Sequence, residues 1–131
     1  MTETLYHPTT PELAARRKEL APGVHEAFEN FSHAVLADGA LPERTKELSA
    51  VAVAHVTQCP YCSNGHPRRA RRKGASPEEI MEAIWVAAEM GAGGADVHVT
   101  LALRAMNAAS SDDDALSEAS TSHLPATWRS P

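Results

Sequence analysis

Two cysteines three residues apart are the side chains of this 131-residue chain that point most directly to chemistry. They are Cys59 and Cys62, and the chain has no others. A pair this close cannot build a disulfide scaffold, and in a reducing compartment a C-x-x-C indicates redox chemistry or half of a metal site. Only a thiolate attacks a peroxide or a disulfide, and an ordinary cysteine has a pKa of about 8.5. One of the two cysteines therefore needs activation.

Two features of the surrounding sequence can activate a thiol. The segment from Cys59 to Cys62 is expected at the start of a helix, where backbone N–H groups stabilise an anion. His66 follows Cys62 by four residues and so lies one turn further along the same helical face. Its imidazole can take the thiol proton or pair with the thiolate. The second cysteine can supply a resolving step, because a sulfenic acid on one of the two can condense with the other to a disulfide.

Glu47 is the expected third participant, because its helix is almost wholly apolar for the next two turns. A carboxylate in such surroundings needs a partner or a proton. The alternative is an exposed glutamate near a helix start, as Glu43 is expected to be. The axial rise places Glu47 about 15 Å from the end of its helix and His66 about 9 Å into the next. In an antiparallel pair these side chains miss by several ångströms, so a bridging water or an offset hairpin is needed.

The elements that must position these residues are expected to be five to six helices. Their predicted ranges are 11–20, 24–37, 42–58, 60–73, 76–90 and, after a break at Gly91–Gly94, 95–109. Proline at or near the first turn marks several starts, and Ser76 with Glu79 forms a capping box. We expect one domain over residues 1–109, with the reactive residues in a core of about 42–106. Residues 110–131 are polar and serine-rich and predict a flexible tail.

Composition excludes several classes of protein. The net charge is −5, which disfavours a basic nucleic-acid binder, and 43% of residues are hydrophobic against 22% charged. The longest apolar stretch, 50–56, is too short to cross a bilayer. No charged and apolar leader is visible at the N-terminus, so a cytoplasmic protein is the expectation. High alanine content with two each of Phe, Trp and Tyr favours an all-α fold.

The spacing of the four candidate residues resembles the AhpD-like branch of the carboxymuconolactone decarboxylase family. The shared pattern is Glu47, eleven residues, Cys59-x-x-Cys62, three residues and His66. The resemblance covers about Pro42 to Met106 and includes the alanine-rich helix, the link from Gly74 to Ile80 and the glycines at 91–94. Two departures stand out. Pro60-Tyr61 replaces a histidine that well-characterised members carry between the cysteines, and Pro67 directly follows His66, where it would make the turn from Cys62 irregular.

The resemblance implies an all-α bundle that assembles as homotrimers or homohexamers and acts as an alkylhydroperoxidase or related disulfide reductase. Cys62 would be the peroxidatic cysteine, Cys59 the proton donor and resolving partner, and His66 with Glu47 the proton relay. It implies no cofactor and no metal. The partners would be a hydroperoxide or small disulfide and an external thiol reductant or redox protein, with no nucleic acid and no membrane.

Four other readings stay open on the residues alone. C-P-Y-C also occurs in glutaredoxins, but these place it after a β-strand, and here a helix is expected. Cys59, Cys62 and His66 could bind zinc with His55 or His98 as a fourth ligand. The chain could be a decarboxylase-like, non-redox member of the family. It could also be a non-enzymatic oligomeric helical module whose cysteines are incidental.

The remaining candidates favour structural roles. His55 lies on an apolar stripe and is expected to be a satisfied core histidine, and His98 is given a similar role. Tyr61 and Trp85 are expected to pack or to line a pocket. The basic run 68–73 is expected to complement the C-terminal end of a helix. Trp128 is expected either to dock on the domain or to stay unanchored.

Overall fold

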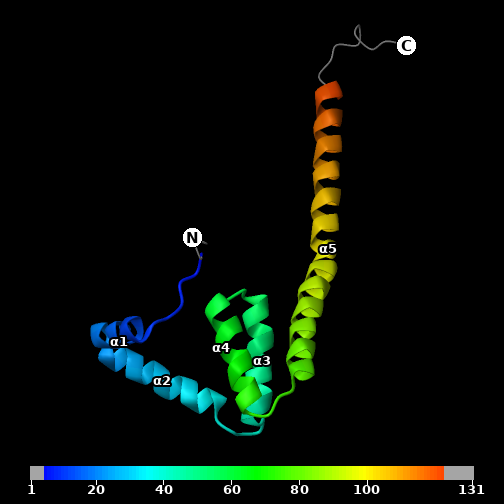
Figure 1. Cartoon of the computed structure of the whole chain (residues 1–131). Helices are drawn as coiled ribbons and strands as arrows, with labels where there is room; N and C mark the ends of the chain where they lie inside the picture. The colour runs from blue at the N-terminus through cyan, green and yellow to red at the C-terminus, as the bar shows by residue number, and fades with distance from the viewer. Residues whose placement is uncertain (1–4, 123–131) are drawn as a thin grey trace. The chain divides into compact units, whose positions relative to one another are not determined.

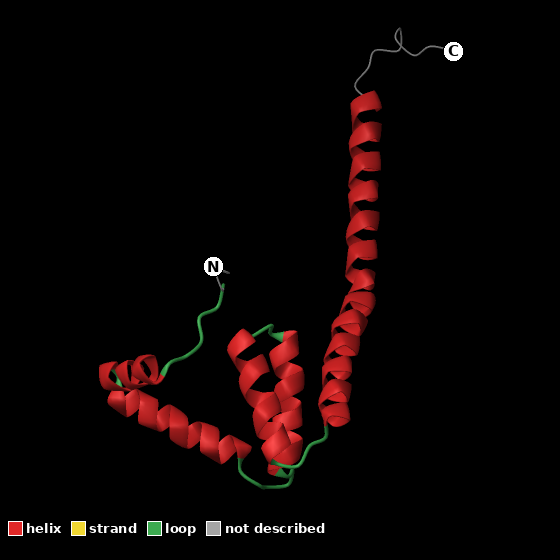
Figure 2. Cartoon of the chain, in the orientation of Figure 1, coloured by secondary structure: helices red, strands yellow, loops and turns green. Residues whose placement is uncertain are grey.

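The computed structural model describes residues 5–122, and this part of the chain consists of helices and loops, with no strand (Figures 1 and 2). The helices are α1 (Pro11–Leu20), α2 (Pro22–Leu36), α3 (Glu43–Val56), α4 (Pro60–Arg72) and α5 (Pro77–Ser122). The predicted all-α class is therefore confirmed. The chain divides into two compact units, residues 1–91 and 92–131, and the candidate site lies wholly in the first.

Helix α1 starts where the sequence predicts, whereas α2 begins at Pro22, two residues before the predicted start at residue 24. The Thr10 hydroxyl caps α1 by accepting the Leu13 N–H at 3.3 Å, and Pro11 takes the first helical position. Pro22 opens α2 in the same way. The apolar stripe of α2 faces outward: Val24, Phe28, Phe31 and Val35 are 48–74% exposed. An amphipathic helix whose apolar side is exposed to water is typical of an interaction surface.

Helices α3 and α4 form an antiparallel hairpin around a small core. Val51 and Ala70 are fully buried together with Ala75, and Ile80 from the start of α5 closes the cluster. A short connection ends α3: Gln58 adopts a left-handed φ of 53°, and the Cys59 N–H bonds the Ala54 carbonyl at 3.1 Å. This is a Schellman motif with glutamine in the place that glycine usually takes. It reverses the chain directly into α4.

Helix α4 is continuous from Pro60 to Arg72 in spite of Pro67 in its interior. The expected irregular turn between Cys62 and His66 is therefore wrong. Proline removes one backbone hydrogen bond, here the one to the Ser63 carbonyl, but the remaining bonds keep the helix intact. Gly74 then ends the segment with a φ of 89°, in a second Schellman motif that bonds the Ala75 N–H to the Ala70 carbonyl at 3.0 Å.

Helix α5 begins at the predicted capping box. The Glu79 N–H donates to the Ser76 hydroxyl at 3.1 Å, and the Ser76 N–H donates to the Glu79 carboxylate at 2.8 Å. The Ser76 backbone N–H, followed by the Arg44 guanidinium, lowers the pKa of Glu79 below its ordinary value. The stability that this cap contributes is therefore fully present above the ordinary carboxyl pKa. It is lost as the pH falls through the lowered pKa of Glu79.

The predicted break at Gly91–Gly94 is wrong, because α5 runs through it without interruption. Glycine lowers helix stability by about 1 kcal/mol per residue but ends a helix only when it turns left-handed. Gly74 does so, whereas none of the glycines at 91–94 has a positive φ. The helix also passes the predicted end at Ala109 and continues to Ser122. The rest of the predicted tail, with Trp128, lies outside the described residues.

None of the described helices is both long enough and apolar enough to span a membrane.

Candidate functional site

The two cysteines lie at the N-terminus of α4 and are joined as a disulfide. Their Cα atoms are 5.3 Å apart. Cys59 is the N-cap residue, and its sulfur accepts the Cys62 N–H at 3.2 Å while Pro60 takes the first helical position. The expected placement of the pair at a helix start is therefore observed. In this position the Cys62 N–H points at the Cys59 sulfur, and the N-terminal end of a helix favours negative charge nearby.

Glu47 and His66 form a direct pair between α3 and α4. The Glu47 carboxylate is 1% exposed and lies 2.7 Å from Nδ1 of His66, whose side chain is 20% exposed. An ionised carboxylate can only accept hydrogen bonds, so with Glu47 ionised Nδ1 is the donor. The second ring nitrogen, Nε2, is then left as a base. Burial of this carboxylate is tolerated because the histidine is its partner.

The expected gap of several ångströms between these two side chains is wrong. That estimate used the axial rise of the two helices alone. Glutamate and histidine each extend several bonds from the backbone, and this reach spans the difference in height. The direct contact needs no bridging water, and the short connection at Gln58 brings the two helices close enough to make it.

The disulfide and His66 lie on the same helix, one turn apart, and Glu47 reaches His66 from α3. Cys62 and His66 are four residues apart in a regular helix and therefore share a face. Within residues 5–122 no hydrogen bond joins His66 to either sulfur, and both sulfurs are held in the disulfide. The structure thus places the predicted site residues in two neighbouring pairs, the disulfide and the Glu47–His66 contact.

Two ion pairs fix α3, the helix that carries Glu47, against its neighbours. Lys73 at the end of α4 contacts the Glu43 carboxylate at 2.7 Å, one turn before Glu47. Arg44 pairs with Glu79 at the start of α5. Exposed pairs of this kind contribute little stability individually. Lys73 thus joins α3 to the end of α4, and Arg44 joins α3 to the start of α5.

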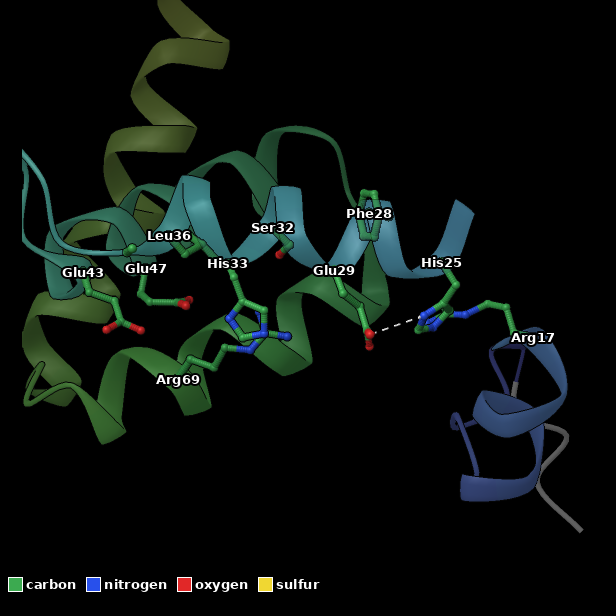
Figure 3. A pocket seen from close by; sticks show the side chains of 11 residues that line it. Arg17, His25, Phe28, Glu29, Ser32, His33, Leu36, Glu43, Glu47 and Arg69 are labelled. Carbon is green, nitrogen blue, oxygen red and sulfur yellow. Dashed lines mark ion pairs between the residues drawn. The ribbon is translucent and has the colours of Figure 1, made fainter. Parts of the chain in front are cut away.

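A cavity of about 460 Å³ is lined by residues of α2 and by Glu47. Figure 3 shows the side chains that line it. Among them, His25 lies 3.5 Å from the Glu29 carboxylate. Its lining includes Arg17, His33, Glu43 and Arg69, but neither cysteine and not His66. Sequence reasoning missed this cavity because its walls come from four helices, and no local spacing connects them.

The other histidines considered as ligands are bonded within their own helices. Nδ1 of His55 donates to the Val51 carbonyl at 2.8 Å, and Nδ1 of His98 donates to the Gly94 carbonyl at 2.5 Å. Over the described part of the chain, no group of three His, Cys, Asp or Glu residues is placed to hold a metal ion. Trp85, expected to pack, is 69% exposed. Arg71 of the basic run donates to the Ala75 carbonyl at 2.6 Å, close to the end of α4.

One contact beside the cysteines could not be found from sequence. The Tyr61 hydroxyl, between the two cysteines, donates to the His7 carbonyl at 3.0 Å. The two residues are 54 positions apart, and a backbone carbonyl leaves no trace in a side-chain pattern.

Solved structures and sequence relatives resemble this chain. A carboxymuconolactone decarboxylase family protein from Legionella pneumophila, in its apo form, has a TM-score of 0.57 and 34% identity, over 59% of this chain and 69% of that one. A protein from Methanobacterium thermoautotrophicum has a TM-score of 0.59 and 38% identity, over 63% and 94%.

Among sequence relatives, uncharacterized protein 4 in the cox locus of Paracoccus denitrificans is 60% identical over 84 residues, which are 64% of this chain and 76% of the relative. An uncharacterized protein of Cupriavidus necator is 35% identical over 82 residues, 63% and 73% of the two chains. The family profile matches residues 22–105 and so begins at α2, twenty residues before the resemblance read from the sequence. The chain belongs to the carboxymuconolactone decarboxylase family.

Proposed function

We propose that this protein is a thiol-dependent oxidoreductase of the AhpD-like type that reduces hydroperoxides through the Cys59–Cys62 pair. The observation that carries the proposal is the buried Glu47–His66 contact of 2.7 Å, one helical turn from Cys62. A satisfied buried acid–histidine pair next to two cysteines at a helix N-terminus is the arrangement that activates a thiol. The family also includes non-redox members, and the cysteine pair with its neighbouring Glu47–His66 pair supports the redox branch.

In the proposed reaction, Nε2 of His66 takes the proton of the Cys62 thiol, and the carboxylate of Glu47 stabilises the resulting imidazolium. The Cys62 thiolate attacks the outer oxygen of a hydroperoxide, ROOH, and the O–O bond breaks. His66 returns the proton to the leaving alkoxide, so ROH departs and Cys62 becomes a sulfenic acid. The Cys59 thiol then attacks that sulfur, water leaves, and the disulfide forms.

An external dithiol or two monothiols must then reduce the disulfide, taking up the oxidising equivalents as a new disulfide. The reductant could be a small thiol or a redox protein. Glu47 also lines the 460 Å³ cavity, at a site that neither sulfur lines.

A titration of thiol reactivity against pH tests the activation directly. The reduced protein is treated with a slow alkylating reagent at each pH, and mass spectrometry identifies the labelled cysteine. We expect Cys62 to react with a midpoint below about 8.5, the ordinary thiol value. In His66→Ala the midpoint rises toward that value, because the thiolate loses its cationic partner.

His55→Ala is the matched control, since His55 is also half-buried but is bonded within α3. It should leave the Cys62 midpoint unchanged. A wild-type midpoint at the ordinary value that does not respond to His66→Ala would contradict the proposed activation. The decarboxylase-like and non-enzymatic readings would then be favoured.

We also propose that the protein acts as a homotrimer or homohexamer. The support is the exposed apolar stripe of α2, in which Phe28 and Phe31 are 67% and 64% exposed with ring centroids 6.4 Å apart. Large aromatic side chains at a protein surface typically lie at interfaces. A second copy of the chain would cover this stripe.

Light scattering should therefore give a mass of three or six chains. Phe31→Glu introduces a charge into the stripe and should shift the mass towards the monomer. Glu26→Gln, on α2 but outside the stripe, should leave the mass unchanged. A monomeric wild-type protein at micromolar concentration would disprove the proposed assembly.

A further inference from the structure

The residue between the two cysteines attaches the N-terminal segment to the redox pair. The Tyr61 hydroxyl donates to the His7 carbonyl at 3.0 Å. Its ring also meets the ring of Tyr6 edge-on, with centroids 6.4 Å apart and planes 82° apart. We call residues 5–9 the strap. Two separate contacts, one polar and one aromatic, thus join the strap to a single side chain.

The strap is anchored at its far end, where Thr10 caps α1. Between its two attachments it does not pack closely. A cavity of about 230 Å³ lies between the strap, α1 and Tyr61, lined by His7, Pro8, Thr9, Leu13, Ala14, Arg17 and Tyr61. Because a cavity underlies the strap, the position of the strap depends strongly on the hydrogen bond and the ring contact that Tyr61 supplies.

The disulfide fixes the position of Tyr61. Residues 60 and 61 lie inside the ring that the Cys59–Cys62 bond closes, and Pro60 already restricts one of their backbone angles. Opening that ring gives the backbone of these residues more freedom. When the strap binds the dithiol form, Tyr61 must lose this freedom. This entropic cost makes the strap bind the dithiol form less tightly than the disulfide form.

We propose that the strap is a redox-sensitive element, held by Tyr61 in the disulfide form and loosened in the dithiol form. Linkage requires the converse: a strap that binds the disulfide form more tightly stabilises the disulfide by the same factor. Tyr61 is then a positioning residue, acting on the equilibrium of the two sulfurs through the backbone between them. The proposal rests on the proposed function only in requiring that the pair cycles between disulfide and dithiol.

The equilibrium between the two forms can be measured in glutathione buffers. In this exchange, the protein disulfide and two glutathione molecules give the protein dithiol and one glutathione disulfide. The balance is read by acid quenching, alkylation and mass spectrometry. Tyr61→Phe removes only the hydroxyl and keeps the ring. Loss of one hydrogen bond predicts a fall of about 2- to 10-fold in the constant for disulfide formation, which is a shift of about 10 to 30 mV to a more oxidising potential.

Ser63→Ala is the matched control, since it also removes a hydroxyl from the first turns of α4, directly after Cys62. It should leave the constant unchanged. A wild-type pair that forms no disulfide in any glutathione buffer would refute the proposed function and this inference with it. A normal disulfide whose constant does not respond to Tyr61→Phe would refute the inference alone.

A second measurement follows the strap itself. The chain has two tyrosines, Tyr6 and Tyr61, so 3-fluorotyrosine labelling gives two fluorine resonances, both from this contact. Tyr61→Phe retains only the resonance of Tyr6, and this assigns both resonances of the wild-type protein. In the wild-type protein we expect the Tyr6 resonance to move toward that of free fluorotyrosine on reduction. Tyr61→Phe keeps the ring contact and loses only the hydrogen bond, so the Tyr6 resonance of its oxidised form should already lie closer to that value than in the oxidised wild-type protein.

Ser63→Ala should retain the wild-type change on reduction. A Tyr6 resonance that is identical in the oxidised and reduced wild-type proteins would overturn the strap proposal, whatever the potential of the pair.

Discussion

Replacing Cys62 by serine is expected to lower hydroperoxide reduction by about 10³-fold or more, because the proposed reaction then has no nucleophile. Serine keeps the size of the side chain and its place on α4, so the helix should remain intact. The half-buried position of Cys62 at a helix N-terminus also tolerates a hydroxyl. The measurement is kcat/KM with an organic hydroperoxide and a thiol reductant, with circular dichroism to confirm the fold.

Cys59→Ser separates the roles of the two cysteines. If Cys62 is the nucleophile, this variant still reacts once and accumulates a sulfenic acid on Cys62, which a sulfenic-acid trapping reagent labels. It cannot close the disulfide, so in the absence of an external thiol the reaction stops after that event. The opposite pattern, with labelling in Cys62→Ser and none in Cys59→Ser, would exchange the two assignments. Equal activity of both variants and the wild-type protein would disprove the thiol mechanism.

Replacing Glu47 by glutamine should have the second-largest effect, a fall of about 10²-fold in kcat/KM. The amide oxygen can still accept a hydrogen bond from Nδ1 of His66, so the ring keeps its orientation. The negative charge that stabilises the imidazolium is lost, and the cost appears in the proton transfer. The buried site also holds a neutral amide more readily than an unpaired carboxylate, so the variant should fold.

Glu43→Gln is the control for this change, since it lies one turn earlier on α3 and pairs with Lys73 at the surface. It removes the same charge from the same helix and should alter kcat/KM by less than about 2-fold. The pH profile of kcat/KM distinguishes a catalytic from a structural effect. Glu47→Gln should change its shape, whereas simple destabilisation would lower the rate equally at every pH. An unchanged profile with a normal rate would remove Glu47 from the relay.

The helix starts could be predicted from sequence because their signals are local. Thr10 with Pro11, and Ser76 with Glu79, each act within one turn, and the structure shows the expected caps. The break at Gly91–Gly94 was predicted on the same grounds and is wrong. The sequence shows the position of a glycine but not its backbone φ. Gly74 has a positive φ and ends its segment, whereas the glycines of α5 do not.

The candidate site could be predicted in its residues but not in its contacts. The spacing of Glu47, Cys59, Cys62 and His66 identified a set that the structure gathers into two pairs. The distance between Glu47 and His66 depends on side-chain reach and on the turn at Gln58, which the axial rise does not include. The contact of Tyr61 with His7 and the two cavities depend on how separate helices pack, and no periodicity in the chain encodes them.

Cys59 ends one helix, begins the next and carries a reacting sulfur. Its N–H closes the end of α3 at Ala54, its carbonyl accepts the Ser63 N–H at 2.9 Å, and its sulfur caps α4. Fraying of either helix end therefore displaces the sulfur even while the rest of the hairpin stays packed. On heating, the redox activity should decline with this local opening, at temperatures where most of the fold is still native.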